Sequence, residues 1–243
     1  MLKYNILENR NCFITGATGG LGRCIAMKMA ENKCNLFLTS TNISKLEILK
    51  EEIESIFPGG ISIYYGTGNL NEISDINNLI QLARDKIKTV DILINCAGVF
   101  LVKALSNSDL GDFDNTFNLN VRAPFIFCKE FSRDMIKNGW GRIINIGSSS
   151  AYAGSKETSL YCASKHSILG FSRALHDELK NNGIRTYCIS PSGIKTEMGK
   201  LIKNQCYETF LDPQEIAEYL AFICSFDGEM ISEEIRLNRM VIK

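Results

Sequence analysis

The sequence lacks several features that define large classes of proteins. Neither sign of charge is in excess, because 27 lysines and arginines balance 27 aspartates and glutamates, and neither sign gathers in a long run. We therefore expect no nucleic acid or anionic membrane surface as a partner, and a small molecule is the better expectation. The apolar runs are far shorter than the roughly 20 residues of a membrane-spanning helix, so we expect no membrane span.

Linkers, targeting segments and paired cysteines are missing as well. No Pro/Ser/Gly-rich, single-charge or low-complexity stretch interrupts residues 11–240, which predicts a single domain over residues 1–243. Residues 1–11 have no apolar core of the kind found in a signal peptide. The nine cysteines are scattered without a C-x-x-C pair, and we expect them to be buried as small hydrophobic residues. The expected location is the cytoplasm, where thiols stay reduced.

Short β-rich runs alternate with longer helical patterns along the chain. Seven runs have strand character, namely residues 12–15, 35–39, 61–65, 90–95, 142–146, 185–190 and 234–237. Amphipathic stretches at helical spacing, such as residues 44–56 and 73–87, lie between them. Because parallel strands need a crossover and the crossover is a helix, the alternation predicts an α/β fold of the Rossmann type. We expect a doubly wound parallel sheet of about seven strands with helices on both faces, and a ligand site beyond the carboxyl ends of the strands.

A glycine-rich loop follows the first of these strands and leads directly into a helical pattern. Glycines let the backbone turn sharply and approach a pyrophosphate, whose charge the N–H groups of the helix N-terminus receive. The loop fits two spacings, G-x-x-x-G-x-G and G-x-x-G-x-x-G, and does not choose between them. Its place in a βαβ series favours a dinucleotide site over a tight turn that binds nothing. The expected contacts there are Gly16, Thr18, Gly19, Gly20, Leu21 and Gly22.

The end of the second strand distinguishes NAD from NADP. An acidic residue at this position would bind the ribose hydroxyls of NAD and repel the 2′-phosphate of NADP. Residues 38–42 read Leu-Thr-Ser-Thr-Asn and contain no carboxylate. We therefore expect NADP(H) to be favoured over NAD(H), with Ser40, Thr41 and Arg23 as candidate donors to the phosphate.

Two Tyr-x-x-x-Lys matches offer a catalytic pair, and their surroundings separate them. Tyr152 and Lys156 lie in a polar, glycine-containing stretch that indicates a loop, whereas Tyr161 and Lys165 open a long helical pattern. Residues four apart on a helix share a face, so the Lys165 ammonium can lie near the Tyr161 phenol. A nearby cation favours the phenolate, and we expect Lys165 to lower the pKa of Tyr161 from its usual value of about 10. Tyr161 is then the expected proton donor or acceptor.

Together these motifs resemble those of the short-chain dehydrogenase/reductase family. The matching positions, in family order over residues 11–240, are Thr15 to Gly22, Asn95 to Gly98, Asn120, Ser148, Tyr161 and Lys165. Ser148 precedes Tyr161 by thirteen residues, the family spacing that sets both hydroxyls on one substrate oxygen. The G-x-x-x-G-x-G spacing resembles the single-domain members, and the other spacing resembles the longer sugar epimerases and dehydratases. The length of the chain favours the single-domain members.

The resemblance implies an NAD(P)(H)-dependent oxidoreductase that interconverts a ketone and a secondary alcohol by direct hydride transfer. Tyr161 would exchange the proton, Ser148 would hydrogen-bond the substrate oxygen, Lys165 would also bind the nicotinamide ribose, and Asn120 would hold a water. Residues from about 194 to 211 would form the substrate loop. The further cofactor contacts that the resemblance implies are Asn69, Leu70, Asn95, Ala97, Gly98, Tyr161, Lys165, Pro191, Ile194 and Thr196. A surface amide at Asn69 and a plain strand-end turn over residues 95–98 are the alternatives.

Within the family, the chain is most similar to 3-oxoacyl-(acyl-carrier-protein) reductases, through its length and residues 69–71 and 146–148. The substrate would then be a 3-oxoacyl thioester, with an acyl carrier protein or a CoA thioester as the candidate partner. Two departures keep a sugar, polyol or other small ketone as an alternative substrate. These reductases contact the acidic carrier protein through basic residues, and the corresponding positions in this sequence are Gly139 and Asn182. The C-terminus also lacks the usual Gly-Gly ending.

A cofactor-sensing protein that has lost catalysis is the alternative from a different class. The intact set of Ser148, Tyr161 and Lys165 argues against it, since a binding module needs none of their spacing. His166 is not the expected base, because a residue next to Lys165 on a helix points about 100° away from it. No His, Cys and Asp cluster has the spacing of metal ligands, so no metal is expected.

Two apolar helical stretches, residues 121–136 and 164–179, indicate an assembly. Their apolar residues exceed the one stripe that covers a sheet, which predicts a homotetramer, or a homodimer if the charged C-terminal segment weakens one interface. The residues that carry this expectation are Phe125, Phe127, Cys128, Phe131, Ala163, Ile168, Phe171, Ala174 and Leu175.

Overall fold

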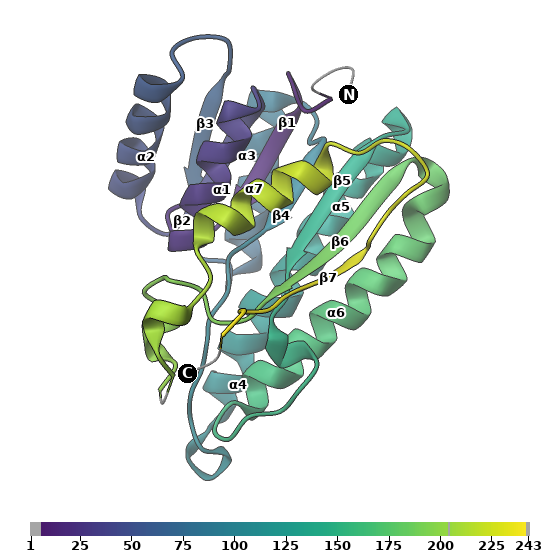
Figure 1. The fold of residues 1–243 in the computed structure, drawn as a ribbon. Coiled ribbons are helices and arrows are strands. Elements are labelled where there is room, and N and C mark those ends of the chain that lie inside the picture. Colours follow the sequence, from purple (N-terminus) through teal and green to yellow (C-terminus); the bar gives the residue numbers. More distant parts are fainter. Residues whose placement is uncertain (1–5, 204, 242–243) are drawn as a thin grey trace.

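The computed structural model describes residues 6–203 and 205–241, in which strands and helices alternate along the chain. The strands are β1 (Asn11–Thr15), β2 (Asn35–Ser40), β3 (Ile63–Thr67), β4 (Ile92–Asn95), β5 (Gly141–Ile146), β6 (Ile184–Pro191) and β7 (Glu234–Leu237). They form one sheet in the order β3-β2-β1-β4-β5-β6-β7, and every neighbouring pair is parallel (Figure 1). The predicted Rossmann-type sheet is confirmed.

Helices cover both faces of the sheet. They are α1 (Gly20–Glu31), α2 (Ile43–Ile56), α3 (Ile73–Ile87), α4 (Leu110–Phe117), α5 (Ala123–Asn138), α6 (Ser159–Leu179) and α7 (Pro213–Cys224). Successive residues of a strand face opposite sides, so Cys12 and Ile14 of β1 pack with α1, α2 and α7, while Phe13 packs with α3 and α5. No helix among the described residues combines the length and apolarity that a membrane crossing requires.

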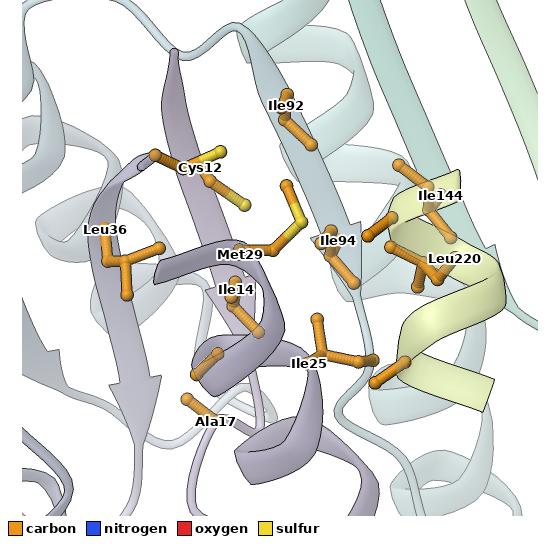
Figure 2. Close-up of a cluster of buried hydrophobic side chains, with 14 of the residues drawn as sticks. Cys12, Ile14, Ala17, Ile25, Met29, Leu36, Ile92, Ile94, Ile144 and Leu220 are labelled. Carbon is orange, nitrogen blue, oxygen red and sulfur yellow. The ribbon is translucent and has the colours of Figure 1, made fainter. Parts of the chain in front are cut away.

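The two core layers are built from different side chains. On the side of α1 and α7, aliphatic residues of the central strands meet Ile25, Met29 and Leu220 (Figure 2). On the other side, the Phe13 ring lies 5.2 Å from the ring of Phe37 and 4.9 Å from that of Phe131, measured between centroids. Removing such a buried ring costs about 3–5 kcal/mol in comparable cores, so these layers fix the strands that carry the site.

The sheet has a switch point between β1 and β4. From β1 the chain moves outward to β2 and then β3, and it then returns to continue on the other side of β1 through β4 and β5. The connections therefore diverge beyond the carboxyl ends of β1 and β4, which leaves a crevice there.

Candidate active site

A cleft of about 1020 Å³ opens at this switch point. The predicted residues that line it are Gly16, Thr18, Gly19, Gly20, Leu21, Gly22, Ser40, Thr41, Asn69, Leu70, Ala97, Gly98, Ser148, Tyr161, Lys165, Pro191, Ile194 and Thr196. Asn95 and Asn120 are buried directly behind this lining. The residues predicted for the cofactor and those predicted for catalysis thus share one cleft.

The backbone geometry of the loop after β1 requires glycine at three positions. Gly16 has a φ of +65°, and a Cβ there would lie 2.8 Å from the Cα of Ala97. A Cβ at Gly22 would lie 2.2 Å from the carbonyl oxygen of Gly16, and one at Gly20 would lie 2.6 Å from the Thr196 methyl carbon. Gly19 meets only the Gly16 oxygen, at 3.3 Å. The close approaches therefore fall on the G-x-x-x-G-x-G spacing.

Helix α1 begins at this loop with its first N–H groups free of any side-chain cap. Gly19 occupies the N-cap position and has no hydroxyl or amide to offer, and the first turn holds no acidic residue. The first N–H groups of a helix lack partners within the helix and carry its positive dipole end, so this end of the cleft suits an anion.

A hydroxyl from β1 ties the end of β4 to the loop. Thr15 Oγ1 accepts hydrogen bonds from the backbone N–H groups of Cys96 and Ala97, both at 3.0 Å. Asn95 lies deeper, where its Nδ2 donates to Asn145 Oδ1 at 2.8 Å. Asn145 in turn donates to Ser172 Oγ at 2.9 Å, so this polar chain braces β4, β5 and α6 beneath the cleft.

The end of β2 has hydroxyl groups and a cation. Ser40 Oγ and Thr18 Oγ1 lie 2.6 Å apart, and Thr41 and Lys45 line the cleft beside them. Arg23 turns to Glu52 in an ion pair and does not line the cleft. Lys45, in the first turn of α2, is thus the cation on this part of the lining, and the sequence analysis did not single it out.

Asn69 closes the turn after β3 with its side chain. Its Oδ1 accepts a hydrogen bond from the backbone N–H of Asn71 at 3.1 Å, while its own N–H donates to Asp75 at 2.8 Å. The residue lines the cleft and is also a satisfied turn amide, so the two interpretations of Asn69 are compatible.

The catalytic candidates come from β5 and α6. Ser148 follows β5, and its Oγ accepts the N–H of Ser150 at 3.1 Å, which leaves the hydroxyl proton free to donate. Tyr161 lies in the first turn of α6, and the edge-on ring of Phe100 holds its ring at a centroid distance of 4.7 Å. Lys165 follows one turn later, with Nζ 5.7 Å from the centre of the Tyr161 ring.

The electrostatics of this pair differ from the sequence expectation. Burial raises the pKa of the Tyr161 phenol, and the hydrogen bond with Ser148 lowers it by less, so the net shift is upward. Burial lowers the pKa of Lys165 to about 8. The prediction that Lys165 brings the pKa of Tyr161 below its usual value is therefore wrong for this structure, because desolvation of the phenol is the largest influence and Ser148, not Lys165, opposes it.

Asn120 is held inside by a break in helical geometry. Residues Asn118–Arg122 form a π-helical segment between α4 and α5. The Asn120 Nδ2 donates to the carbonyl of Val99 and to Ser164 Oγ, each at 3.0 Å, and its Oδ1 accepts the N–H of Val99 at 2.9 Å. Both amide protons are used, so any further ligand of this side chain must donate to Oδ1. A Cβ at Gly98 would lie 2.9 Å from that oxygen.

The rival residues point elsewhere. Tyr152 does not line the cleft, and the guanidinium of Arg236 lies 4.1 Å over its ring. His166 is also absent from the lining, and its Nδ1 lies 2.8 Å from the carbonyl oxygen of Cys162.

Sequence reasoning missed three residues that matter at this site: Lys45, Phe100 and Arg239. Phe100 lies in the segment that follows β4, and this position could have indicated it. Lys45 lies in the first turn of α2, shortly after the hydroxyls of residues 40 and 41, which is a usable signal. Arg239 reaches the cleft through the last segment of the chain, and nothing local marks it.

Comparisons with known proteins agree with this geometry. The short chain dehydrogenase family model matches residues 10–206. A 3-oxoacyl-[acyl-carrier-protein] reductase FabG of Buchnera aphidicola subsp. Baizongia pistaciae is 32% identical over 91% of this chain and 92% of its own. One from Aquifex aeolicus is 26% identical over 94% of this chain and 95% of its own.

Solved structures have the same fold. A dehydrogenase/reductase from Sinorhizobium meliloti superposes with a TM-score of 0.86 and 26% identity, over 98% of this chain and 97% of that one. A blue fluorescent protein from a metagenomic library, solved in complex with NADPH, gives a TM-score of 0.85 and 28% identity over 96% of both chains. With its seven-stranded parallel sheet and a family model covering most of its length, this chain belongs to the short-chain dehydrogenase family.

Proposed function

We propose that this chain interconverts a ketone and a secondary alcohol with NAD(P)(H), using Ser148, Tyr161 and Lys165. The observation that carries the proposal is that these three side chains line the same cleft as the glycine loop. A cofactor on the loop would therefore reach a substrate on the hydroxyls. The relatives named as 3-oxoacyl-[acyl-carrier-protein] reductases support the same reaction class.

The residues present fit a nicotinamide dinucleotide. The uncapped start of α1 suits the pyrophosphate, and the backbone at Gly16, Gly20 and Gly22 leaves no room for side chains that would fill the loop. Lys165 and the segment after β6, with Ile194 and Thr196, would hold the nicotinamide end. When bound, the nicotinamide supplies or accepts the hydride at the carbonyl carbon.

Tyr161 and Ser148 act on the substrate oxygen. In reduction, the Tyr161 phenol gives its proton to the oxygen as the carbonyl becomes an alcohol, and in oxidation the phenolate takes that proton back. Ser148 donates its free hydroxyl proton to the same oxygen and stabilises the negative charge that develops there. The N–H of Ser150 uses one lone pair of the Ser148 oxygen, and the hydroxyl keeps its own proton for donation.

Lys165 and Asn120 support this exchange. Lys165 donates one of its three ammonium protons to the carbonyl of Ile146 at 2.8 Å, which leaves two for the cofactor ribose or the phenolate. Asn120 would hold the water that returns a proton from solvent, with Oδ1 as the acceptor.

We propose NADP(H) as the favoured cofactor. The end of β2 carries no carboxylate, and Lys45 stands in the lining beside Thr41 without an ion-pair partner among the described residues. A cation and hydroxyl groups match the extra phosphate of NADP. Fluorescence titration of both reduced cofactors tests this, with Lys45→Ala expected to weaken NADPH alone and Arg23→Ala as the matched control. Tighter binding of NADH by the wild type would overturn the preference.

The substrate is proposed to be a 3-oxoacyl thioester or a ketone that resembles one. Met198, Leu201 and Ile202 of the loop over residues 194–211 line the cleft and provide an apolar wall for an acyl chain. A hydrogen bond from the N–H of Lys195 to the carbonyl of Leu211 closes this loop at its base, at 2.9 Å. A sugar, polyol or other small ketone is the alternative. Carrier-bound or CoA-bound thioesters are the proposed partner class, and the cytoplasm is the proposed compartment, since all nine cysteines are free thiols.

A panel of ketones and alcohols, followed by the absorbance of the reduced nicotinamide with both cofactors, tests the proposal. The panel contains four groups of compounds: thioesters of 3-oxo acids, sugars, polyols and simple ketones. Turnover of any ketone supports oxidoreductase chemistry, and the group of compounds with the highest kcat/KM assigns the substrate class. Tight cofactor binding without turnover of any compound in the panel would favour the cofactor-sensing alternative.

A further inference from the structure

Arg239 joins the end of the chain to the loop over the cleft. It follows β7, and Figure 1 shows the chain beyond β7 passing beside the segment that connects β6 and α7. Its Nη2 donates to Gln205 Oε1 at 2.6 Å and its Nη1 donates to Thr209 Oγ1 at 3.2 Å. The guanidinium lies 4.8 Å over the ring of Phe210, and the residue lines the cleft.

The positive charge of Arg239 is not compensated by these contacts. Both of its acceptors are neutral, one an amide and one a hydroxyl. Its Nε–H is buried and has no acceptor among the described residues. An arginine has five N–H donors, so three are left without a partner, and a half-buried cation without an anion is electrostatically incomplete.

Two further cations of the cleft lining are unpaired. Lys156, from the loop before α6, and Lys203, from the loop over residues 194–211, make no ion pair within the described residues. The carboxylates of the whole lining are Glu157 and Glu197, and Glu197 forms an ion pair with Lys200, which is not in the lining. In the described part of the chain, the lining therefore holds more unpaired cations than free carboxylates, and Arg239 is the one among them with a buried donor that lacks an acceptor.

We infer that the substrate is a ketone that also carries an anionic group, and that Arg239 binds this carboxylate or phosphate while Ser148 and Tyr161 hold the carbonyl. The inference rests on the proposed function and narrows its substrate class. Arginine binds both kinds of oxyanion through paired N–H donors. The anion comes either from a small keto acid or from the phosphate of a phosphopantetheine-type thioester. A neutral sugar or polyol would leave Arg239 uncompensated.

Two matched pairs of probes test the inference and distinguish these sources. Levulinate and methyl levulinate differ by a carboxylate, and S-acetoacetyl phosphopantetheine and S-acetoacetyl pantetheine differ by a phosphate. For each pair, kcat/KM is measured with the wild type, Arg239→Gln, Arg239→Lys and the control Arg236→Gln. Arg236 lies in the same C-terminal segment but does not line the cleft.

The wild type is expected to prefer the charged member of at least one pair by roughly tenfold or more, the size of a charged hydrogen bond. Arg239→Gln should abolish that preference, Arg239→Lys should keep part of it, and Arg236→Gln should keep all of it. An equal loss on charged and neutral members would show that Arg239 only fastens the loop, and it would overturn the inference. No preference in either pair with the wild type would do the same.

Binding separates this inference from the proposed function. Calorimetric titration of the four probes into cofactor-saturated wild type and Arg239→Gln makes the same comparison without turnover. Binding of a charged probe that depends on Arg239 supports the inference even where no probe is reduced, and that lack of reduction counts against the proposed function alone. Charged and neutral probes that bind equally to both proteins count against the inference. Unchanged cofactor affinity in Arg239→Gln verifies that the cleft is intact.

Discussion

The Tyr161 phenol is protonated at neutral pH even at its usual pKa of about 10, and burial raises that pKa further. The protonated phenol is the form that donates to a carbonyl oxygen, so this setting favours reduction, and oxidation of an alcohol should speed up as the pH rises. We predict that Tyr161→Phe lowers turnover about 100-fold or more, the loss typical of a general acid, without changing the fold or cofactor binding. Steady-state rates and a cofactor titration measure the two effects.

Tyr152→Phe is the matched control for that experiment. Tyr152 belongs to the other Tyr-x-x-x-Lys match, and its ring packs under Arg236, away from the cleft. Its substitution should leave turnover within a few-fold of the wild type. Equal turnover in Tyr161→Phe and the wild type would move the proton transfer to another residue.

Lys165 should make the stability of the protein depend on pH. Burial lowers the pKa of Lys165 from 10.5 to about 8. Below about pH 8 both the folded and the unfolded chain hold this proton, and the buried charge then costs roughly 3 kcal/mol. Between the two pKa values the folded state releases the proton first, so the cost falls as the pH rises, and it is gone above the unfolded pKa.

This dependence of stability on pH should disappear in the variant Lys165→Met, which has no charge to bury. Relative to the wild type, this variant should be more stable at about pH 7 than at about pH 10, with a difference of roughly 2–3 kcal/mol in the free energy of unfolding. The substitution also removes the donor to the Ile146 carbonyl, but at both pH values, so the difference isolates the titration. Urea unfolding at the two pH values measures it. A stability difference between variant and wild type that does not change with pH would contradict the lowered pKa.

At the residue scale, prediction from sequence succeeded where a position is fixed by local spacing. The helical interval of Tyr161 and Lys165 and the place of Ser148 after a strand put all three in the lining. It failed on the pKa of Tyr161, because desolvation depends on what the rest of the chain packs around the phenol, including Phe100. Arg239 was missed for a similar reason, since its contacts lie in a loop some 30 positions earlier.

At the scale of elements, the strand β3 shows how packing overrides a local signal. The sequence pattern placed it at residues 61–65, which ends before the glycine at position 66. The structure pairs Ile63 with Leu36 and continues through Gly66, which pairs with Thr39. A Cβ at Gly66 would lie 2.9 Å from Leu79 of α3, so the glycine lets that helix approach the strand. Tertiary packing of this kind is not visible in a local pattern.

The end of α7 is anchored to β5 by one buried side chain, and its removal should destabilise the fold. The Arg142 guanidinium is fully buried. It donates to the carbonyls of Cys224 at 3.3 Å and Phe226 at 2.8 Å and pairs with Asp227 at 2.6 Å, while its face lies 4.2 Å over the Trp140 ring. Arg142→Met would leave the carbonyls of Cys224 and Phe226 without this donor and Asp227 with only the Trp140 indole N–H, and we predict a loss of about 3 kcal/mol in the free energy of unfolding.

Arg173→Met is the comparison for Arg142→Met. Arg173 forms an ion pair with Glu234 at 2.5 Å, but its side chain is 55% exposed. An exposed pair contributes less than about 1 kcal/mol, so the urea midpoint of this variant should shift little. A similar shift in both variants would show that Arg142 stabilises the fold no more than a surface residue does.

At the scale of the whole molecule, the alternation of strands and helices was enough to predict the sheet and its faces, because parallel neighbours require helical crossovers. The argument for an assembly needs correction in its details. Phe127, Cys128, Phe131 and Ile168 were counted as apolar residues in need of a partner, but the core of the chain itself buries them. The physical reason is that α5 and α6 pack against the sheet over a wider stripe than the pattern indicated.

The apolar surface that is left still supports the prediction of a homo-oligomer. On α5, Phe125 is 48% exposed and Ile136 is 42% exposed, and on α4 the side chain of Leu110 is 81% exposed. Burying such residues against a second copy gains roughly 25 cal/mol per Å² of apolar surface. Monomeric proteins rarely expose a contiguous apolar patch of more than a few hundred Å². We therefore predict a dimer or tetramer that uses the α5 and α6 face.

Light scattering at micromolar concentration should give a multiple of the 27.2 kDa chain mass. Phe125→Glu should then shift the protein toward the monomer, because it places a charge in the predicted interface. Phe222→Glu changes an exposed position of α7 and tests for a second interface. If α7 completes a tetramer, the tetramer should dissociate to a dimer in this variant. A wild type that stays monomeric while it turns over substrate would refute the assembly and leave the exposed Phe125 and Ile136 of α5 to some other partner.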